Sequence, residues 1–288
     1  MRWIDIKRRL YRDRRRLVFV TGMAAIAFFV VFRGIDLIVL GLPLPIFAAL
    51  VGSVFVFSLE LFVLRVIPHI RFSAEILAVT GTTAFFMIAL CPPARQLALN
   101  EPSLMAILIA LATFLLYQLV YGRWSDLVLS KVTQTDRATS VTSLDLETVW
   151  TSFIPIPGKP EFHYDRTVKE IVADPSDPDV IYMHHHFPSG WRMTRRVFID
   201  YTEPLKFYKC LVSIEGARDG REVPQVITLI FEEYDGKVCV HMRITRSHMP
   251  RRKILMRWMD DYAGRVLDDI LSRIEIQAEK HEAQAGRG

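Results

Sequence analysis

The sequence predicts two structural classes in one chain: an N-terminal all-α transmembrane region with four spans, and a C-terminal α+β domain. Three observations predict this division. Long apolar runs fill residues 17–124, whereas apolar and polar residues alternate after residue 133. Residues 1–130 carry a net charge of +6 and residues 131–288 one of −1. The chain, at 288 residues, is long enough for two such units.

Residues 1–16 form a basic tail. Eight Lys and Arg residues lie in it and are opposed only by Asp5 and Asp13. A basic cluster beside an apolar span is explained by membrane topology and by anionic lipid headgroups. We therefore expect a lipid partner for this tail and no nucleic acid.

Four apolar segments predict the four spans, since a spanning helix needs roughly 20 predominantly apolar residues. They cover residues 17–40, 46–66, 73–91 and 103–121. Residues rich in Pro and Gly separate them and predict turns or loops at 41–45, 68–71 and 92–102. The first apolar run is too long for a cleavable signal peptide and is not followed by a cleavage site of small residues.

The distribution of positive charge predicts the orientation of the spans. Arg and Lys lie in the N-terminal tail, between residues 65 and 71, and after Tyr121. Because positive loops stay in the cytoplasm, both termini and the C-terminal domain are expected there, at a bacterial inner membrane crossed several times. Glu60 and Glu75 lie near the cytoplasmic edge, where we expect them to pair with Arg65 and Arg71 rather than to form a proton path.

The C-terminal half predicts strands followed by a long helix. A first strand at 133–142 leads into a short helix at 144–153, with Ser143 as its N-cap. Asp235-Gly236 is a strong hairpin signal between the last two strands. An amphipathic helix follows Pro250, over residues 251–279. The remaining strands are expected at 163–173, 180–187, 192–201, 206–215, 225–234 and 237–246.

Two segments resemble a known superfamily. They are SLDLETVWTSF at 143–153 and RRKILMRWMDDYAGRVLDDILSRIE at 251–275. With the order of the elements, they resemble the START-like, Bet v 1-like helix-grip superfamily (SRPBCC), also called the polyketide cyclase/dehydrase and lipid-transport group. The resemblance covers residues 133–280 and leaves 281–288 as a flexible tail. It implies a curved antiparallel sheet around the long C-terminal helix, with a cavity between them for a hydrophobic ligand.

Strand alternation and helix periodicity then give the candidate cavity residues. The parity of residues 193, 197 and 199 would aim Arg195 into the cavity, where it could bind a ligand carboxylate or phosphate; it could also pair with a neighbouring Glu. Ordinary core packing is the alternative for each apolar candidate. The candidates are Arg195, Val197, Ile199, Tyr208, Cys210, Val212, Leu229, Val240, Met242, Trp258 and Tyr262.

Other motifs indicate no catalytic centre, metal site or cofactor. In a strand, the middle residue of His184-His185-His186 points away from its neighbours, so we expect strand histidines at a polar rim. Cys91, Cys210 and Cys239 have no metal-ligand spacing. Asp260-Asp261 and Asp268-Asp269 are adjacent on the expected helix and so predict a solvated acidic face. No phosphate loop or nucleophile elbow is present in the sequence.

These patterns favour a membrane-anchored cytoplasmic domain that binds a hydrophobic or lipid-like small molecule. One alternative is a cyclase or aromatase acting on an apolar substrate, for which Arg195, His185 or Tyr208 would supply the polar group. Another is a regulatory protein that joins a membrane-protein partner. A cavity would favour the first two readings, and a solid core with an exposed apolar patch would favour the third.

Overall fold

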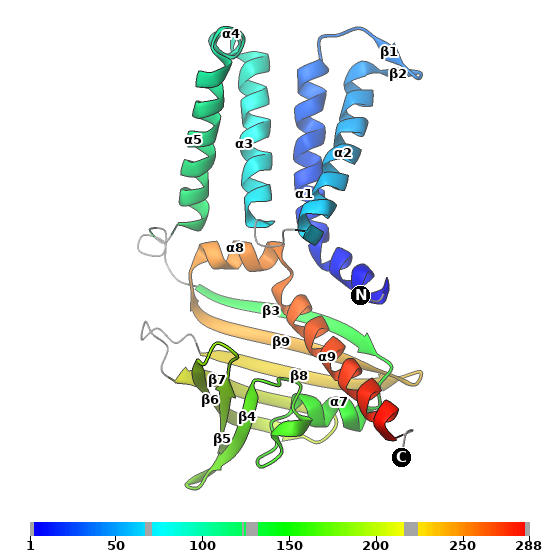
Figure 1. Ribbon diagram of the computed structural model, residues 1–288, viewed down its shortest axis with the longest axis vertical. Coiled ribbons are helices and arrows are strands. Elements are labelled where there is room, and N and C mark those ends of the chain that lie inside the picture. Colours follow the sequence, from blue (N-terminus) through cyan, green and yellow to red (C-terminus); the bar gives the residue numbers. More distant parts are fainter. Residues whose placement is uncertain (1–2, 67–70, 123, 125–131, 216–223, 286–288) are drawn as a thin grey trace. The chain divides into compact units, whose positions relative to one another are not determined.

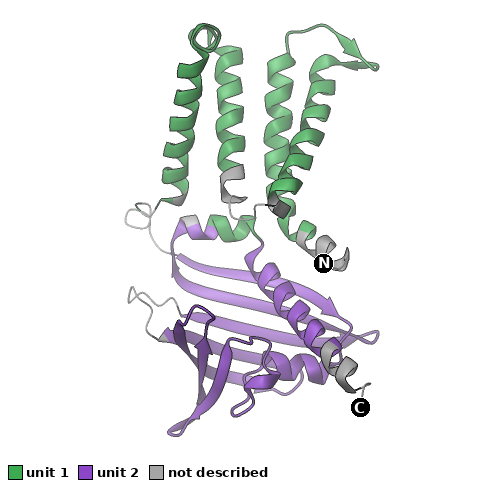
Figure 2. Ribbon diagram, viewed as in Figure 1, with its two compact units in different colours: residues 1–130, 255–260 green, residues 131–254, 261–288 purple. Residues whose placement is uncertain are grey.

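The computed structural model describes residues 3–66, 71–122, 124, 132–215 and 224–285. They divide into two compact units (Figure 2). Unit 1 comprises residues 1–130 and 255–260, and unit 2 comprises residues 131–254 and 261–288. Each unit has its own packing and is described by itself.

Unit 1 is built from helices (Figure 1). They are α1 (Trp3–Phe32), α2 (Leu44–Val66), α3 (Arg71–Leu90), α4 (Pro92–Asn100) and α5 (Pro102–Tyr121). The two-residue strands β1 (Ile38–Val39) and β2 (Leu42–Pro43) pair at the expected turn between α1 and α2. The basic residues after Trp3 belong to the first turns of α1.

The expected loop at 92–102 was wrong, because it contains helix α4. Pro92 and Pro102 each lie in the first turn of a helix, where a missing backbone N–H costs nothing. Between them the chain offers good helix formers such as Ala and Leu. The proline-rich stretch therefore starts two helices instead of forming one loop.

The number of independent spans is also corrected, from four to three. Leu10–Phe32, Leu44–Val63 and Pro102–Val120 are each long and apolar enough to cross a membrane. The segment predicted as the third span meets the test only jointly, as Glu75–Leu90 followed by Pro92–Asn100 with a bend of 104° between them. A fourth span exists only if this bent pair counts as one.

A fully buried arginine joins distant segments of unit 1. Arg16 donates from Nε to Glu75, and from Nη2 to Asp260 Oδ1 at 2.8 Å. The expected pairing of Glu60 and Glu75 with Arg65 and Arg71 cannot be placed, since those two arginine side chains lie outside the described residues.

The long C-terminal helix is broken, which corrects two expectations. It forms α8 (Arg251–Met259) and α9 (Tyr262–Ala285), and Asp261 between them has a φ of 45°. Asp260 is only 6% exposed, so the expectation of a solvated acidic face was wrong at this position. Its carboxylate is held by Arg16 instead.

Unit 2 has one seven-stranded antiparallel sheet in the order β3-β9-β8-β7-β6-β5-β4. Strands β4 to β9 form a meander, and β3 closes onto β9. The strands are β3 (Val132–Thr142), β4 (Val168–Asp174), β5 (Asp177–His186), β6 (Arg192–Glu203), β7 (Phe207–Glu215), β8 (Gln225–Tyr234) and β9 (Lys237–Met249).

The predicted hairpin between β8 and β9 is confirmed. Asp235 and Gly236 both have positive φ, 52° and 67°, as a two-residue turn between twisted strands requires. Several other boundaries differ from expectation, and two of them have a clear local cause. Helix α7 (Leu146–Phe153) is capped by Asp145, which accepts from Thr148 N, rather than by Ser143. Strand β4 begins at Val168, because a short 3₁₀ helix at Pro160–Phe162 precedes it.

Helices α7 and α9 cover one face of the sheet, and the hydrophobic core lies between them and the sheet (Figure 1). This is the helix-grip type of arrangement that the resemblance implied. Helix α9 contributes Leu267, Ile270, Leu271 and Ile274 to this core. Two hydrogen bonds tie it to the edge strand β3: Ser140 donates to Asp268 at 2.7 Å, and Thr142 to Glu275 at 3.1 Å.

Candidate ligand cavity

A cavity of about 290 Å³ lies within unit 2, with side chains of the sheet and of α9 in its lining. This volume lies just below the range of roughly 300–1,000 Å³ typical of small-molecule sites. The hollow expected between sheet and helix is therefore present.

Eight of the eleven candidate residues line this cavity. They are Arg195, Val197, Tyr208, Cys210, Val212, Leu229, Met242 and Tyr262. Among the three that do not, Ile199 precedes a register shift in β6, and Val240 is fully buried in the core. Trp258 belongs to unit 1, where it is 52% exposed beneath the Arg15 guanidinium, because the helix breaks after it.

The sequence analysis missed fourteen lining residues, of which some had a signal. Alternation from Met242 along β9 gives Ile244 and Arg246, and helical spacing from Tyr262 gives Val266 and Ile270. The lining residues before β4 were missed because residues 163–173 were predicted to form one strand, whereas β4 begins only at Val168. The missed residues are Phe153, Pro155, His163, Tyr164, Asp165, Met183, Gln225, Ile227, Ile244, Arg246, Val266, Asp269, Ile270 and Arg273.

A group of polar residues lies at one part of the lining, where the segment before β4 meets β5 and β6. This polar group consists of His163, Asp165, Thr167, His185 and Arg195. Asp165 accepts hydrogen bonds from Thr167 N at 3.0 Å and Thr167 Oγ1 at 2.8 Å. His185 Nδ1 lies 2.9 Å from Thr167 Oγ1 and 3.6 Å from Asp165 Oδ2. His163, Asp165 and Arg195 face the cavity, with the other two residues behind them.

Both histidines of this group are uncharged at neutral pH. Burial lowers the pKa of His163 to about 4. Burial, and then the charge of Arg195, lower the pKa of His185 to about 4 as well. Burial alone would raise the pKa of Asp165, but hydrogen bonds from Thr167 outweigh it and lower that pKa. Asp165 is thus the carboxylate of the group.

The three consecutive histidines alternate as predicted, with His185 fully buried and His186 exposed. The expected rim position was wrong for His185, which packs behind the cavity wall and stacks on Phe187 at 6.1 Å. Across the described ranges, no three His, Cys, Asp or Glu side chains gather closely enough to hold a metal ion.

Tyr208 and Cys210 are neighbours on the cavity face of β7 and stay protonated. Burial raises the pKa of Tyr208, and raises that of Cys210 to about 12. A thiol in that state is a poor nucleophile. The Tyr208 hydroxyl lies beside the Cys210 thiol, but within the described part of the chain no hydrogen bond of normal geometry reaches it.

Two arginines of the lining differ in their partners. Arg246 lies 3.2 Å from both Asp136 Oδ2 and Gln225 Oε1, and its guanidinium sits over the Tyr262 ring. Arg195 makes no ion pair with any residue whose side chain is described, and its Nε is buried without a hydrogen-bond acceptor. Arg246 therefore stabilises the wall of the cavity. Among the described residues, Arg195 Nε and the Tyr208 hydroxyl are buried donors without an acceptor.

The cavity thus combines apolar walls with hydrogen-bond donors fixed in one protonation state. Val197, Val212, Leu229 and Met242 are buried and supply much of the apolar wall. Proton transfer at neutral pH calls for groups with a pKa near 7. Tyr208, Cys210 and His163 are shifted away from that range, so the arrangement is suited to holding a molecule more than to moving protons.

No family model matches the chain, and no curated protein matches it either. Among solved structures, a conserved protein from Geobacillus kaustophilus is 14% identical with a TM-score of 0.38, over 51% of this chain and 96% of that one. Ara h 8.0201 is 12% identical with a TM-score of 0.39, over 49% and 97%. The di-domain ARO/CYC protein StfQ from the steffimycin biosynthetic pathway is 14% identical with a TM-score of 0.36, over 62% and 61%. Similarities at this level establish no family.

Proposed function

We propose that unit 2 binds a hydrophobic, lipid-like small molecule in the cavity beside α9, and that the N-terminal helices anchor it to a membrane. One observation carries the proposal. The cavity is walled by buried apolar side chains and holds two buried donors without acceptors, the Tyr208 hydroxyl and Arg195 Nε. An unpaired buried polar atom costs roughly 1–3 kcal/mol. A ligand that brings an acceptor on an apolar body would remove that cost.

The anchor has a physical rationale for such a ligand. Three helices of unit 1 are long and apolar enough to span a bilayer. A pocket tethered to the membrane meets a molecule dissolved there at high effective concentration. With the basic residues of α1 on the cytoplasmic side, the ligand would reach unit 2 from the inner leaflet without crossing bulk water.

An enzyme acting on an apolar substrate is the second candidate. It has a specific observation in its favour, since His163, Asp165, Arg195 and Tyr208 all face the cavity. The pKa values weigh against it, because the histidine is neutral and the phenol and thiol are locked in their protonated forms. We therefore place binding ahead of catalysis.

Photolabelling tests the proposal on the full chain in nanodiscs. The probe is a long-chain fatty acid that carries a diazirine and an alkyne. We expect it to label peptides from β6 to β9 and from α9. Leu229→Trp should reduce this labelling about tenfold, since Leu229 lines the cavity and a larger ring would fill it.

Ile230 offers the matched control, because it is the next residue of β8 and faces outward with 39% exposure. Ile230→Trp should leave the labelling unchanged. Thermal unfolding of both variants shows whether either has lost its fold. Labelling of unit 2 that is absent, or that survives Leu229→Trp in a folded protein, contradicts the proposal.

A further inference from the structure

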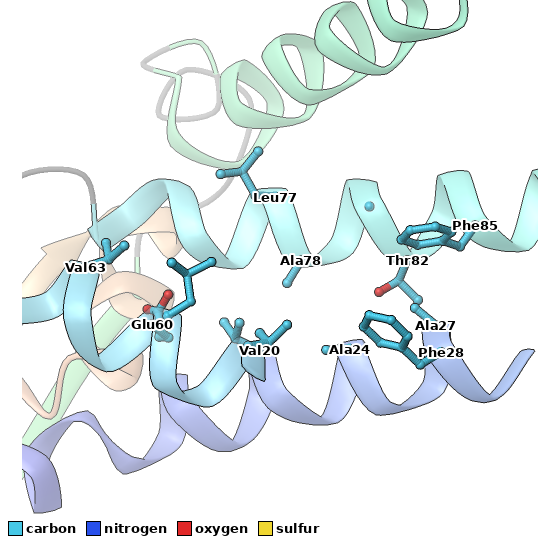
Figure 3. A pocket seen from close by; sticks show the side chains of 13 residues that line it. Val20, Ala24, Ala27, Phe28, Glu60, Val63, Leu77, Ala78, Thr82 and Phe85 are labelled. Atoms are coloured by element: carbon cyan, nitrogen blue, oxygen red, sulfur yellow. The ribbon is translucent and has the colours of Figure 1, made fainter. Parts of the chain in front are cut away.

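A second hollow lies within unit 1, between helices α1, α2 and α3 (Figure 3). It is a groove of about 280 Å³, and small residues on α1 and α3 make room for it: Ala24, Ala27, Ala78 and Gly81. Larger apolar side chains, among them Val20 and Leu77, complete the walls. The groove belongs to the candidate membrane spans and is independent of the cavity in unit 2.

Glu60 on α2 is the one charged residue in the lining of this groove. It is only 6% exposed, and its Oε1 is buried without a hydrogen-bond partner. Within the described ranges, no ion pair to Glu60 is present either. A buried carboxylate in an apolar region costs several kcal/mol unless it is paired, and such residues mark functional sites in membrane segments.

The nearest cation does not supply the missing partner. Arg16 faces Glu60 electrostatically, but its Nε and Nη2 already donate to Glu75 and Asp260. One guanidinium is therefore shared by two hydrogen-bonded carboxylates, and Glu60 is a third one nearby. Among the described side chains, Glu60 therefore has no cation hydrogen-bonded to it.

The shape of the groove suits a molecule with a head and a tail. Glu60 lies one turn from the end of the candidate span Leu44–Val63, and Glu60 and Val63 together lie toward one end of the labelled lining residues. Phe28 and Phe85 lie at the other end, with ring centroids 6.5 Å apart (Figure 3). A polar head at Glu60 would thus be near a membrane surface, and an apolar chain would extend into the bilayer.

We propose that this groove binds a single-chain amphiphile with a protonated amine head. The ammonium group donates an N–H to Glu60 Oε1 and neutralises the carboxylate. Its chain lies along Val20 and Ala78 toward Phe28. A charged N–H to carboxylate bond is about twice as strong as a neutral one, so the amine is favoured over an alcohol of the same length.

Paired photoprobes test this on the full chain in phosphatidylcholine nanodiscs, whose headgroups have no N–H. One probe is a long-chain primary amine with a diazirine and an alkyne, and the other is the matched alcohol. We expect the amine to label peptides of α1 and α3. Glu60→Gln keeps the shape of the side chain and should reduce amine labelling about tenfold, the effect of losing a charged hydrogen bond, with little change for the alcohol.

A second pair of variants tests the groove itself. A side chain at Gly81 would enter open space, since no atom lies within 4 Å of its would-be Cβ, so Gly81→Leu should fill the groove and abolish labelling by both probes. Gly22 on α1 is equally open but outside the groove, and Gly22→Leu should change nothing. Leu229→Trp in unit 2 should have no effect on amine labelling either.

Equal labelling by amine and alcohol, unchanged in Glu60→Gln, overturns the proposal and leaves a groove that any lipid chain enters. Amine labelling that survives Gly81→Leu overturns it as well. If Glu60→Gln fails to fold, the Gly81→Leu and Gly22→Leu pair and the amine-to-alcohol ratio in the unaltered protein still decide the question.

Discussion

Tyr208 places a hydroxyl among apolar side chains where, within the described part of the chain, no hydrogen bond reaches it. Such a group lowers the stability of the unliganded protein, because on folding the hydroxyl loses its hydrogen bonds to water and forms none within the protein. The same group strengthens the complex when a ligand brings an acceptor. Stability and binding therefore respond in opposite directions when the hydroxyl is removed.

Tyr208→Phe should stabilise the unliganded protein by about 1 kcal/mol, since it removes an unpaired buried hydroxyl without changing the shape of the ring. The same substitution should weaken binding of the fatty-acid probe. Chemical denaturation and photolabelling of the full chain measure the two effects. Loss of stability with unchanged labelling would mean that the hydroxyl has a structural partner and no ligand.

The histidines of the polar group make the stability of unit 2 depend on pH. The pKa values of His163 and His185 are about 4 in the folded state, below the usual value of about 6.5. Between these values the unfolded chain binds more protons at the two histidines than the folded one does, so their contribution to stability falls as the pH is lowered from about 6.5 to about 4 and is constant above that window.

His185→Gln should make this pH dependence shallower, because one of the two shifted histidines is gone while the amide can still bond to Thr167. The free energy of unfolding of unit 2, measured by pulse proteolysis of the full chain at several pH values, gives the slope. His186→Gln is the control, since His186 is the exposed neighbour. An unchanged slope in His185→Gln would contradict the assignment.

Residues of the cavity could be predicted from the sequence where they lie in a regular strand or helix, because the side chains there repeat with a known period. Arg195, Val197, Tyr208 and Val212, which alternation assigned to one face of their strands, all line the cavity. The same reasoning failed for His163 and Asp165, since the irregular segment before β4 has no period. It also failed at Ile199, where a register shift follows. The irregular segment before β4 thus supplies two polar lining residues, His163 and Asp165, that the sequence did not reveal.

At the scale of elements, the strands and the β8–β9 hairpin followed from alternation and turn residues. The break between α8 and α9 did not. Residues 251–279 keep a helical period throughout, and nothing local marks Asp260 as the end of a helix. At the break, Asp260 accepts a buried hydrogen bond from the distant Arg16, and Asp261 has a positive φ. Contacts of this kind cannot be seen in a local pattern.

Asp260→Asn should destabilise unit 1 by about 3 kcal/mol, because it removes one of the two carboxylates that compensate the buried guanidinium of Arg16. The loss should appear in chemical denaturation of the full chain. Asp269→Asn is the control, since Asp269 forms an exposed pair with Arg273. Equal stability of both variants would show that the Arg16 contact contributes little.

At the scale of the whole molecule, the sequence predicted a helical unit and an α+β unit, and both are present. Four spans were predicted, whereas three helices among the described residues pass as spans, and a fourth exists only if the pair bent between α3 and α4 counts as one. Anchoring in a membrane, with unit 2 in the cytoplasm, is part of the proposal. Each unit contains a hollow with its own unpaired polar group, Tyr208 and Arg195 in one and Glu60 in the other.

Native mass spectrometry of the full chain, released gently from detergent, tests the occupancy of unit 2 most directly. In Gly81→Leu, whose groove in unit 1 is filled, the account predicts one bound apolar molecule per chain, retained when Ile230→Trp is added and lost when Leu229→Trp is added. A chain that carries no such adduct under any membrane-derived condition, or one whose adduct persists when Leu229→Trp fills the cavity, would contradict it.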